Sequence, residues 1–300
     1  MKKDFLTLLD LTSEELQALL RRAAEFKSGK DVSACPLMGK SIGLMFNKTS
    51  TRTRISFQTG IYQLGAQAIY INTNELQLGR GESLEDTARV LSRFLHGIVI
   101  RTYEHSTIEK LAANSTIPII NGLTDLHHPC QALADVLTVR ENKGRLRDVR
   151  MAYIGDGNNV ANSLIEAALL TGIDLVLACP KGLEPDSMVL ENARSGGAKV
   201  RVLTDPAEAA KDADVLYTDV WISMGQEKEV ERKKKKFEGY QINRRLVSLA
   251  KPDAIVMHCL PAHRGEEITD EVLDSPRSVV IDQAENRLHT QKALLEMLVK

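Results

Sequence analysis

The sequence contains little that would crosslink the chain, draw it to a polyanion or insert it into a membrane. Its 300 residues include four cysteines, which are widely spaced and form no Cys-x-x-Cys pair. This gives no indication of a zinc or redox centre and favours a reducing compartment. The formal net charge is −1, so the molecule as a whole has no attraction to nucleic acid or to an anionic membrane. No run approaches the ~20 apolar residues that span a bilayer.

The most basic segment is the tetralysine run at positions 233–236. Glutamates on both sides of it largely neutralise its charge, so a solvated helix face explains it better than a nucleic-acid patch does. The amino terminus, Met1-Lys2-Lys3-Asp4, leads into a polar helical pattern in place of the apolar core of a secretory signal. We therefore expect a cytoplasmic protein with no nucleic-acid or membrane partner.

Short apolar runs alternate with helix-length segments along most of the chain. This alternation is typical of parallel sheets covered by helices on both faces. A chain of 300 residues that is 43% hydrophobic is long enough for two domains, each with its own core. The sequence therefore predicts an α/β fold of two doubly wound parallel-sheet domains, with the catalytic cleft between them. The predicted strands are Ile42–Phe46, Ala68–Ile71, Ile98–Ile100, Ile117–Ile120, Val149–Ile154, Leu175–Ala178, Val200–Leu203, Val215–Tyr217, Ile255–Met257 and Val279–Ile281.

A polar stretch at residues 141–145 separates the two predicted domains. It follows an apolar, helical segment at Ala132–Val139, and its composition suits a hinge or a surface turn. We expect the first domain to span residues 1–140 and the second to span residues 141–285. The final residues, 286–300, are expected to form a helix that packs back on the first domain.

A cluster of hydroxyls and guanidiniums, Ser50-Thr51-Arg52-Thr53-Arg54, follows the first predicted strand. A helix is predicted to begin at this cluster, because apolar residues follow it at helical spacing. The N-terminus of a helix presents unpaired N–H groups and the positive end of the helix dipole to an anion. The two arginines can add charge-assisted hydrogen bonds worth roughly 1.5–3 kcal/mol each. The cluster predicts a site for a phosphorylated ligand.

Reactive side chains also follow several other predicted strands. In open α/β folds, ligands bind beyond the carboxyl ends of the strands, so these side chains are expected to line one site. The set comprises Arg101, Asp125-Leu126-His127-His128-Pro129-Cys130-Gln131, Gly155-Asp156-Gly157-Asn158-Asn159, Asp219 and His258-Cys259-Leu260-Pro261.

Four of these motifs occur together in one enzyme family. They are the Ser50–Arg54 cluster, His128-Pro129-Cys130-Gln131, Asp219 with Ser223-Met224-Gly225, and His258-Cys259-Leu260-Pro261. Over nearly its whole length the chain resembles the aspartate/ornithine carbamoyltransferase family. It is more similar to the ornithine-specific members. The aspartate-specific members typically have Thr at the position of Cys130, and they lack the Ser-Met-Gly and His-Cys-Leu-Pro elements.

The resemblance implies transfer of a carbamoyl group from carbamoyl phosphate to the side-chain amine of L-ornithine, which gives L-citrulline and phosphate in arginine biosynthesis. It implies that residues 1–140 bind carbamoyl phosphate and that residues 141–285 bind ornithine. It also implies a homotrimer whose active sites are shared between subunits, and an enzyme that needs neither a metal ion nor an organic cofactor.

Carbamoyl phosphate needs a grip on its phosphate, polarisation of its carbonyl group and an anchor for its NH₂ group. The hydroxyl and guanidinium groups at residues 50–53 suit the phosphate, and Arg101 can bridge phosphate and carbonyl. His128 can donate a hydrogen bond to the carbonyl oxygen as negative charge builds there. Gln131 offers an amide oxygen to the NH₂ group.

The resemblance adds further ligands for carbamoyl phosphate. Gln77 is expected to reach the phosphate of a neighbouring subunit, and Arg287 is expected to reach it from the C-terminal segment. The full expected set is Ser50, Thr51, Arg52, Thr53, Gln77, Arg101, His128, Gln131, Cys259, Leu260 and Arg287.

The attacking amine must lose its charge before it can react. An alkyl amine with a pKa near 10.4 is neutral in only about one molecule in 2,500 at pH 7, which adds roughly 4–5 kcal/mol to the barrier. Nearby arginines and the exclusion of water disfavour the ammonium form. Cys259 is the expected proton acceptor or orienting group, and Arg101, His128 and Gln131 are the other expected catalytic residues.

The ornithine site is expected in the second domain. Asp219 suits the α-ammonium group and Asn159 the α-carboxylate, while Ser223 and Met224 are expected to close over the aliphatic chain. The glycine that follows them, Gly225, allows this loop to move as a lid.

Two alternatives stay open at the level of the sequence. One is a related carbamoyltransferase that acts on putrescine or an acylated ornithine, and the other is a non-catalytic protein that binds carbamoyl phosphate. Asp219 and the Ser-Met-Gly element favour an unmodified amino acid, and the complete set of carbonyl-polarising residues favours catalysis. Gly155-Asp156-Gly157 follows a strand as a dinucleotide fingerprint does, but the third glycine is missing. A nicotinamide dehydrogenase is therefore not supported.

Overall fold

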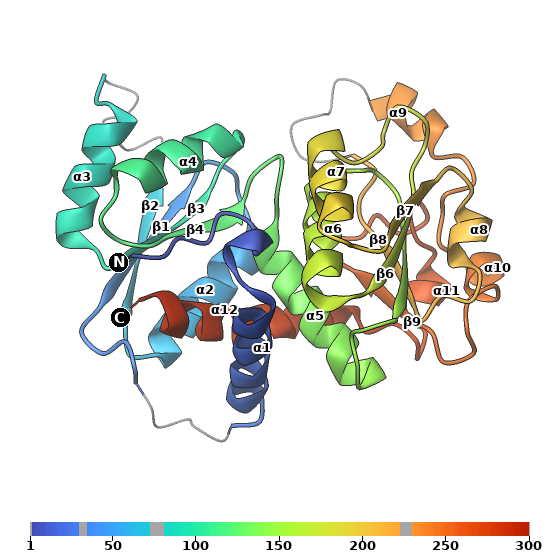
Figure 1. The fold of residues 1–300 in the computed structure, drawn as a ribbon, viewed down its shortest axis with the longest axis horizontal. Helices are drawn as coiled ribbons and strands as arrows, with labels where there is room; N and C mark the ends of the chain where they lie inside the picture. Colours follow the sequence, from blue (N-terminus) through green and yellow to red (C-terminus); the bar gives the residue numbers. More distant parts are fainter. Residues whose placement is uncertain (1, 30–34, 73–80, 223–229, 300) are drawn as a thin grey trace. The chain divides into compact units, whose positions relative to one another are not determined.

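The chain folds into two compact units. The computed structural model describes residues 2–29, 35–72, 81–222 and 230–299 (Figure 1). The first unit comprises Met1–Ala134 and Glu285–Lys300, and the second comprises Asp135–Ala284. Each unit contains a parallel β-sheet and a hydrophobic core of its own.

The sheet of the first unit has the strand order β2-β1-β3-β4, and its neighbouring strands run parallel. The three strands other than β2 are almost wholly buried, as expected of a parallel sheet covered on both faces. The strands are β1 (Ser41–Phe46), β2 (Gln67–Asn72), β3 (Gly97–Arg101) and β4 (Ile119–Leu123). The helices are η1 (Leu8–Asp10), α1 (Ser13–Lys27), α2 (Thr51–Gln63), α3 (Leu84–Phe94), α4 (His105–Asn114), the start of α5 (Pro129–Lys143) and most of α12 (Val280–Leu298).

The sheet of the second unit has the order β7-β6-β5-β8-β9 and is also parallel throughout. Its core contains small and branched side chains from the strands, packed against Phe237 and Tyr240. The strands are β5 (Arg150–Ile154), β6 (Asp174–Ala178), β7 (Val200–Leu203), β8 (Val215–Thr218) and β9 (Ile255–His258). The helices entirely within it are α6 (Asn159–Thr171), α7 (Ser187–Ser195), α8 (Pro206–Ala210), α9 (Val230–Lys236), α10 (Arg244–Val247) and α11 (Asp270–Leu273).

Each sheet reverses its strand order at one place, the topological switch point, which is where a ligand is expected to bind. In the first unit the chain moves from β1 outward to β2 and then crosses to β3 and β4. In the second unit it moves from β5 to β6 and β7 and then crosses to β8 and β9. Ligands of open α/β sheets bind beyond the carboxyl ends of the strands at such a switch point. The prediction of an α/β fold with two doubly wound parallel sheets is confirmed.

One predicted strand is wrong. The run Val279–Ile281 was expected to be a strand, but α12 begins at Val280. The chain makes one parallel bridge there, between Ser278 and Val256, and then turns into the helix. Ile281 is 72% exposed, so the run is not a buried strand. Three apolar residues are too few to distinguish a strand from the first turn of a helix.

A second strand is shifted along the sequence. The run Ile117–Ile120 was expected, whereas β4 spans Ile119–Leu123. Pro118 precedes the observed strand, and a proline has no N–H group to donate to a sheet.

None of the described helices has the length and apolar character that crossing a membrane requires.

Candidate active site

The Ser50–Arg54 cluster lies at the N-terminus of α2, beyond the carboxyl end of β1. Ser50 is the N-cap residue, and its hydroxyl accepts a hydrogen bond from the backbone N–H of Thr53 at 3.2 Å. The side chain of Thr53 is buried, that of Arg52 is half-buried and that of Thr51 is exposed. Four N–H groups at the start of a helix lack partners within the helix, and the dipole adds positive charge there. This end of α2 is therefore a place where an anion is stabilised.

The two arginines of the cluster have different surroundings. The guanidinium of Arg54 lies over the ring of Tyr70, 3.9 Å from its centroid. Such a cation–π contact holds a guanidinium against the aromatic face. Arg52 lies within electrostatic range of His128, since its charge lowers the pKa of that imidazole. Of the two arginines, Arg52 is the one that interacts with another predicted ligand-binding residue, His128.

Arg287 contacts two of the other predicted residues. Its guanidinium donates to the amide oxygen of Gln131 at 2.7 Å and to the hydroxyl of Thr53 at 3.2 Å. Arg287 is 3% exposed and Gln131 is 2% exposed. A buried guanidinium is stable only when its donors are satisfied, so these contacts fix the α12 residue against α2 and α5. They also engage the Gln131 oxygen that was expected to anchor the carbamoyl NH₂ group.

His128 and Arg101 lie in the same unit and interact. Burial lowers the pKa of His128 well below its ordinary value, and the charges of Arg287, Arg101 and Arg52 lower it further. His128 is therefore a neutral imidazole near pH 7, which can donate one hydrogen bond to a carbonyl oxygen without carrying a charge. Three cations around one neutral donor form an environment suited to a phosphate and to a developing negative charge.

Cys130, between His128 and Gln131 in the sequence, is a packed residue. It is fully buried, and its thiol donates to the backbone oxygen of Asn121 at 3.2 Å. Burial raises the pKa of Cys130 to about 12. A thiol in such surroundings is chemically inert.

In the second unit, Asp219 follows β8 at the switch point. Its Oδ2 accepts a hydrogen bond from Nδ2 of Asn158 at 2.7 Å. The amide oxygen of Asn158 caps α6: Oδ1 accepts hydrogen bonds from the backbone N–H groups of Val160 and Ala161 at 2.9 and 3.2 Å. Asn158 thus ties the carboxylate of Asp219 to the start of α6. The sequence indicated Asn159 and missed this role of Asn158, although an Asn directly before a helix is a known N-cap signal.

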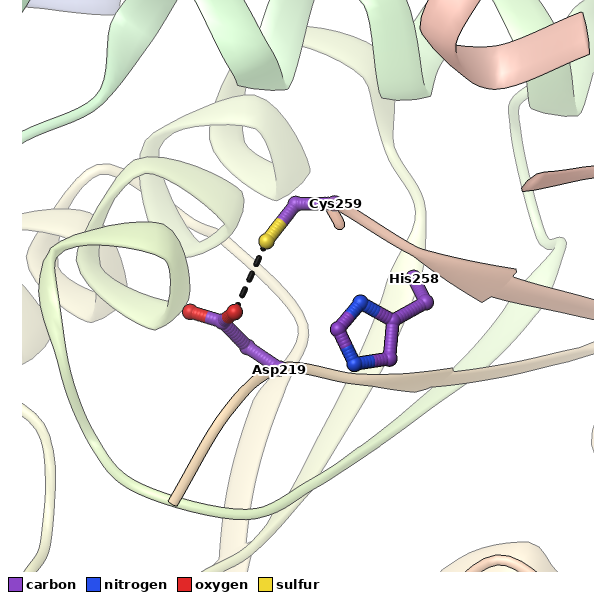
Figure 2. A group of neighbouring side chains, drawn as sticks. All are labelled: Asp219, His258 and Cys259. Atoms are coloured by element: carbon purple, nitrogen blue, oxygen red, sulfur yellow. Dashed lines mark hydrogen bonds between the residues drawn. The ribbon is translucent and has the colours of Figure 1, made fainter. Parts of the chain in front are cut away.

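Cys259 points at the same carboxylate (Figure 2). Its Sγ lies 2.8 Å from Oδ1 of Asp219, and the thiol is the donor because a carboxylate only accepts. The same Oδ1 accepts from the backbone N–H of Val220 at 2.7 Å. Among the described residues, Asp219 makes no ion pair: its hydrogen-bond partners are all neutral. Within the described ranges, hydrogen bonds are therefore what offsets its buried negative charge.

His258 holds the backbone around Cys259. Its Nδ1 accepts from the N–H of Leu260 at 2.9 Å, and its Nε2 lies 3.1 Å from Oε1 of Glu267. His258 and Glu267 are both fully buried. The residue Leu260 has φ of 56°, a left-handed conformation that a non-glycine residue adopts only when its surroundings hold it there. Glu267 was missed in the sequence, since nothing near it marks it as a partner of His258.

The ligand atoms of Asp219, His258 and Cys259 lie within 4.8 Å of one another (Figure 2). Such a group can bind a metal ion only if its nitrogen and sulfur atoms are available as ligands. Both ring nitrogens of His258 are engaged, one with Leu260 and one with Glu267. The His258 ring is therefore a structural support of the Cys-Leu-Pro turn, and we assign no metal ion to these residues.

Comparison with known proteins decides the family. Residues 3–141 match the family model described as the carbamoyl-P binding domain of aspartate/ornithine carbamoyltransferase, and residues 147–298 match its Asp/Orn binding domain. The chain belongs to the aspartate/ornithine carbamoyltransferase family.

Members of this family with high similarity cover the whole chain. An ornithine carbamoyltransferase from Syntrophus aciditrophicus is 54% identical over 302 residues, which is 100% of both chains. The solved structure of ornithine carbamoyltransferase from Pyrococcus furiosus is 51% identical, with a TM-score of 0.94 and coverage of 99% and 97% of the two chains. The Thermus thermophilus enzyme structure is 43% identical with a TM-score of 0.92, and each chain is covered completely. The sequence-based assignment to this carbamoyltransferase family is confirmed.

Three predicted site residues of this family member, Gln77, Ser223 and Met224, lie outside the described residues, as does Gly225. The remaining predicted residues fall in two groups. Ser50, Thr51, Arg52, Thr53, Arg101, His128, Gln131 and Arg287 belong to the first unit, and Asn159, Asp219, Cys259 and Leu260 belong to the second. Asn159 is half-buried and is the first residue of α6.

The partial glycine motif after β5 has a structural explanation in this family member. A Cβ atom on Gly157 would lie 2.2 Å from the backbone carbon of Glu184 and 2.2 Å from the backbone nitrogen of Pro185. Only glycine permits so close an approach of two backbones. Gly157 is therefore required for packing against residues 184–185, and the motif gives no support to dinucleotide binding.

Proposed function

We propose that this chain transfers the carbamoyl group of carbamoyl phosphate to the side-chain amine of L-ornithine, forming L-citrulline and phosphate. The observation that carries the proposal is the buried carboxylate of Asp219. It lies at the switch point of the second sheet, and its hydrogen-bond donors among the described residues are all neutral. Such a carboxylate is suited to a substrate that brings its own ammonium group, as an α-amino acid does.

Carbamoyl phosphate binds to the first unit in this proposal. The N-terminus of α2, with Ser50, Thr51, Arg52 and Thr53, receives the phosphate. Arg101 is 6% exposed at the end of β3 and bridges phosphate and carbonyl oxygen. The neutral imidazole of His128 donates to the carbonyl oxygen, where negative charge grows during attack.

Arg287 and Gln131 act as a pair on the carbamoyl end. The guanidinium donates a hydrogen bond to the Gln131 amide oxygen at 2.7 Å. An amide oxygen has two acceptor positions, so Gln131 can accept from the carbamoyl NH₂ group while Arg287 still orients it. The Arg287 guanidinium carries further N–H donors for the phosphate.

Ornithine binds to the second unit. Asp219 receives the α-ammonium group, and Asn158 keeps its carboxylate in place through the 2.7 Å hydrogen bond. Asn159 at the start of α6 receives the α-carboxylate, which the helix N-terminus also stabilises. Ser223 and Met224 complete the proposal as residues that cover the aliphatic chain, and Leu260 with Cys259 contributes backbone contacts to the carbamoyl group.

The chemical step is a displacement at the carbonyl carbon. The neutral side-chain nitrogen of ornithine attacks that carbon, the bond from carbon to the bridging oxygen breaks, and its electron pair leaves with phosphate. The nitrogen then gives up a proton, which the departing phosphate can accept. Since the Cys259 thiol is already a hydrogen-bond donor to Asp219, its role in this step is to orient and not to accept the proton.

We also propose a cytoplasmic homotrimer, with Gln77 completing the site of the neighbouring subunit. Light scattering at concentrations above and below those used for activity measures the mass directly. A mass of three chains supports shared sites, and an active single chain of 33.2 kDa contradicts them.

Formation of the carbamoylated (ureido) product, which is citrulline when the amine is ornithine, tests the reaction. Purified protein is given carbamoyl phosphate and one of four amines: L-ornithine, putrescine, N-acetylornithine or L-aspartate. The highest kcat/KM is expected with ornithine, and faster turnover of another amine would contradict the proposal. If carbamoyl phosphate binds but no phosphate is released in the presence of any of the four amines, the non-catalytic alternative is established.

A further inference from the structure

Two buried carboxylates of the second unit, Asp156 and Asp219, lie within electrostatic range of each other, and among the described residues only one of them has a cationic partner. Asp156 follows β5 and Asp219 follows β8, the two strands that flank the switch point. They are 7% and 6% exposed. Oδ2 of Asp156 is 2.6 Å from Nζ of Lys233 on α9, and the two side chains are 10% and 12% exposed. Asp219 has only neutral partners among the described residues.

The contact between Lys233 and Asp156 is a sequestered ion pair. Buried charges of opposite sign with a short hydrogen bond interact strongly, and removing one partner leaves the other uncompensated. Burial raises the pKa of Asp156, and the charge of Lys233 acts in the opposite direction. Lys233 thereby favours the ionised form of Asp156 and offsets its charge.

The other titratable groups that face these carboxylates do not change the count of charges in contact. Tyr153 of β5 and Tyr217 of β8 are fully buried, and burial raises the pKa of both well above the ordinary value, so both are neutral. Burial also raises the pKa of Cys179, which follows β6, so this thiol is neutral too. Lys236 of α9 affects Asp156 more weakly than Lys233 does, and the Cys259 thiol donates to Asp219. Within the part of the chain that the structure describes, two carboxylates and one contacting ammonium leave one negative charge without a cationic contact.

A single negative charge matters because the two amines of ornithine must be in different states. The α-amine has to be an ammonium group in order to pair with Asp219, whereas the side-chain amine has to be neutral in order to attack. In water at neutral pH both are protonated. A second uncompensated carboxylate in the pocket would stabilise the second ammonium group, and therefore the unreactive form.

We propose that Lys233, by pairing with Asp156, limits the ornithine pocket to one ammonium group and so selects ornithine with an uncharged side-chain amine. This inference rests on the proposed function. Lys233 is then a specificity-determining residue that acts through Asp156, without contact with the reacting atoms.

The test is the pH dependence of kcat, measured from pH 6.5 to 10 by citrulline formation with both carbamoyl phosphate and ornithine saturating, because kcat reports the pKa values of groups in the enzyme–substrate complex. In Lys233→Met the acidic limb of the profile, where the rate falls with falling pH, is expected to shift to higher pH by about one unit. The reason is that a nearby charge shifts a pKa, here that of the bound side-chain amine, by roughly 1–3 units. The rate falls about tenfold at pH 7 and converges with that of the unmodified protein at high pH. Lys233→Arg, which keeps the charge, is expected to retain the original profile.

Two further variants make the result specific. Lys235→Met removes a lysine from an exposed position of the same helix and is expected to leave the profile unchanged. The double variant Asp156→Asn/Lys233→Met removes both charges of the pair and is expected to return the acidic limb to its original position. A loss of equal size at every pH in Lys233→Met, or no recovery in a folded double variant, would overturn the inference.

The same experiment separates this inference from the proposed function. An unmodified protein that makes no citrulline from ornithine contradicts the function. An active Lys233→Met variant with an unshifted limb contradicts only the role of Lys233.

Discussion

The thiol of Cys259 donates a hydrogen bond to the carboxylate of Asp219 at 2.8 Å. A cysteine beside a carboxylate keeps its proton, because a thiolate there would face a like charge. The sequence had suggested either a proton acceptor or an orienting group at this position. The contact favours the orienting role, in which sulfur and Asn158 together hold the Asp219 carboxylate from two sides.

Replacement of Cys259 distinguishes these roles. Cys259→Ser keeps a donor to Asp219, so it is expected to retain most of the ornithine affinity. Cys259→Ala removes the donor and is expected to raise KM for ornithine roughly 10- to 100-fold, because a hydrogen bond to a charged group contributes ~1.5–3 kcal/mol. Steady-state kinetics at several pH values measure both. A base at Cys259 would instead give the same loss of kcat in both variants.

Asp219→Asn is expected to weaken ornithine binding far more than carbamoyl phosphate binding. The substitution keeps the shape of the side chain and removes the charge that pairs with the α-ammonium group. KM for each substrate, determined at saturation with the other, checks this. Equal increases in both KM values would mean that Asp219 supports the general structure of the site.

Arg52→Ala is expected to weaken phosphate binding by about 10- to 100-fold, since charge-assisted hydrogen bonds of ~1.5–3 kcal/mol are lost. Arg54→Ala is the matched control: its guanidinium stacks on Tyr70, so a much smaller effect is expected. Inhibition constants for inorganic phosphate give the comparison. Unchanged inhibition in Arg52→Ala would remove this residue from the phosphate site.

His128 is expected to make the protein less stable in acid. Folding lowers the pKa of His128 below 6.5, so the unfolded chain binds this proton more readily than the folded one. The contribution is constant above pH 6.5 and is lost as the pH falls below it, by up to about 1.4 kcal/mol per pH unit. Urea unfolding of the unmodified protein and of His128→Gln at pH 7.5, 6.5 and 5.5 measures it.

The difference in unfolding free energy between these two proteins should shrink as the pH falls. His263→Gln, at an exposed position, controls for the loss of a histidine. Parallel pH dependences of the unmodified protein and His128→Gln would contradict the assignment of a buried, neutral imidazole.

The fold class was predictable because the pattern that specifies it is local. Short apolar runs such as Leu175–Ala178 and Val200–Leu203 were expected as strands and lie within β6 and β7. The error at Val279–Ile281 arose where local pattern is ambiguous, since three apolar residues suit both a strand and a helix start. One bridge from Ser278 to Val256 and the packing of α12 decided it.

The site was predictable only in part. Polar residues after strands indicated candidate binding edges, because parallel strands bring their carboxyl ends to one edge of the sheet. The supporting partners were not predictable: Glu267 beside His258 and Lys233 beside Asp156 come from segments whose local sequence suggests ordinary surface residues. The lysine run in particular was interpreted as a solvated face, and Lys233 is instead 12% exposed and paired.

The sequence alone determined the type of elements, the family and the residues able to bind an anion and an amino acid, because these depend on residue type, spacing and motif. The tertiary structure decided which polar and charged side chains contact one another. It placed Asn158 and Cys259 on Asp219, and Lys233 on Asp156. The physical reason is that the energy of a charge depends on burial and on neighbours a few ångströms away, and those neighbours are brought together only by folding.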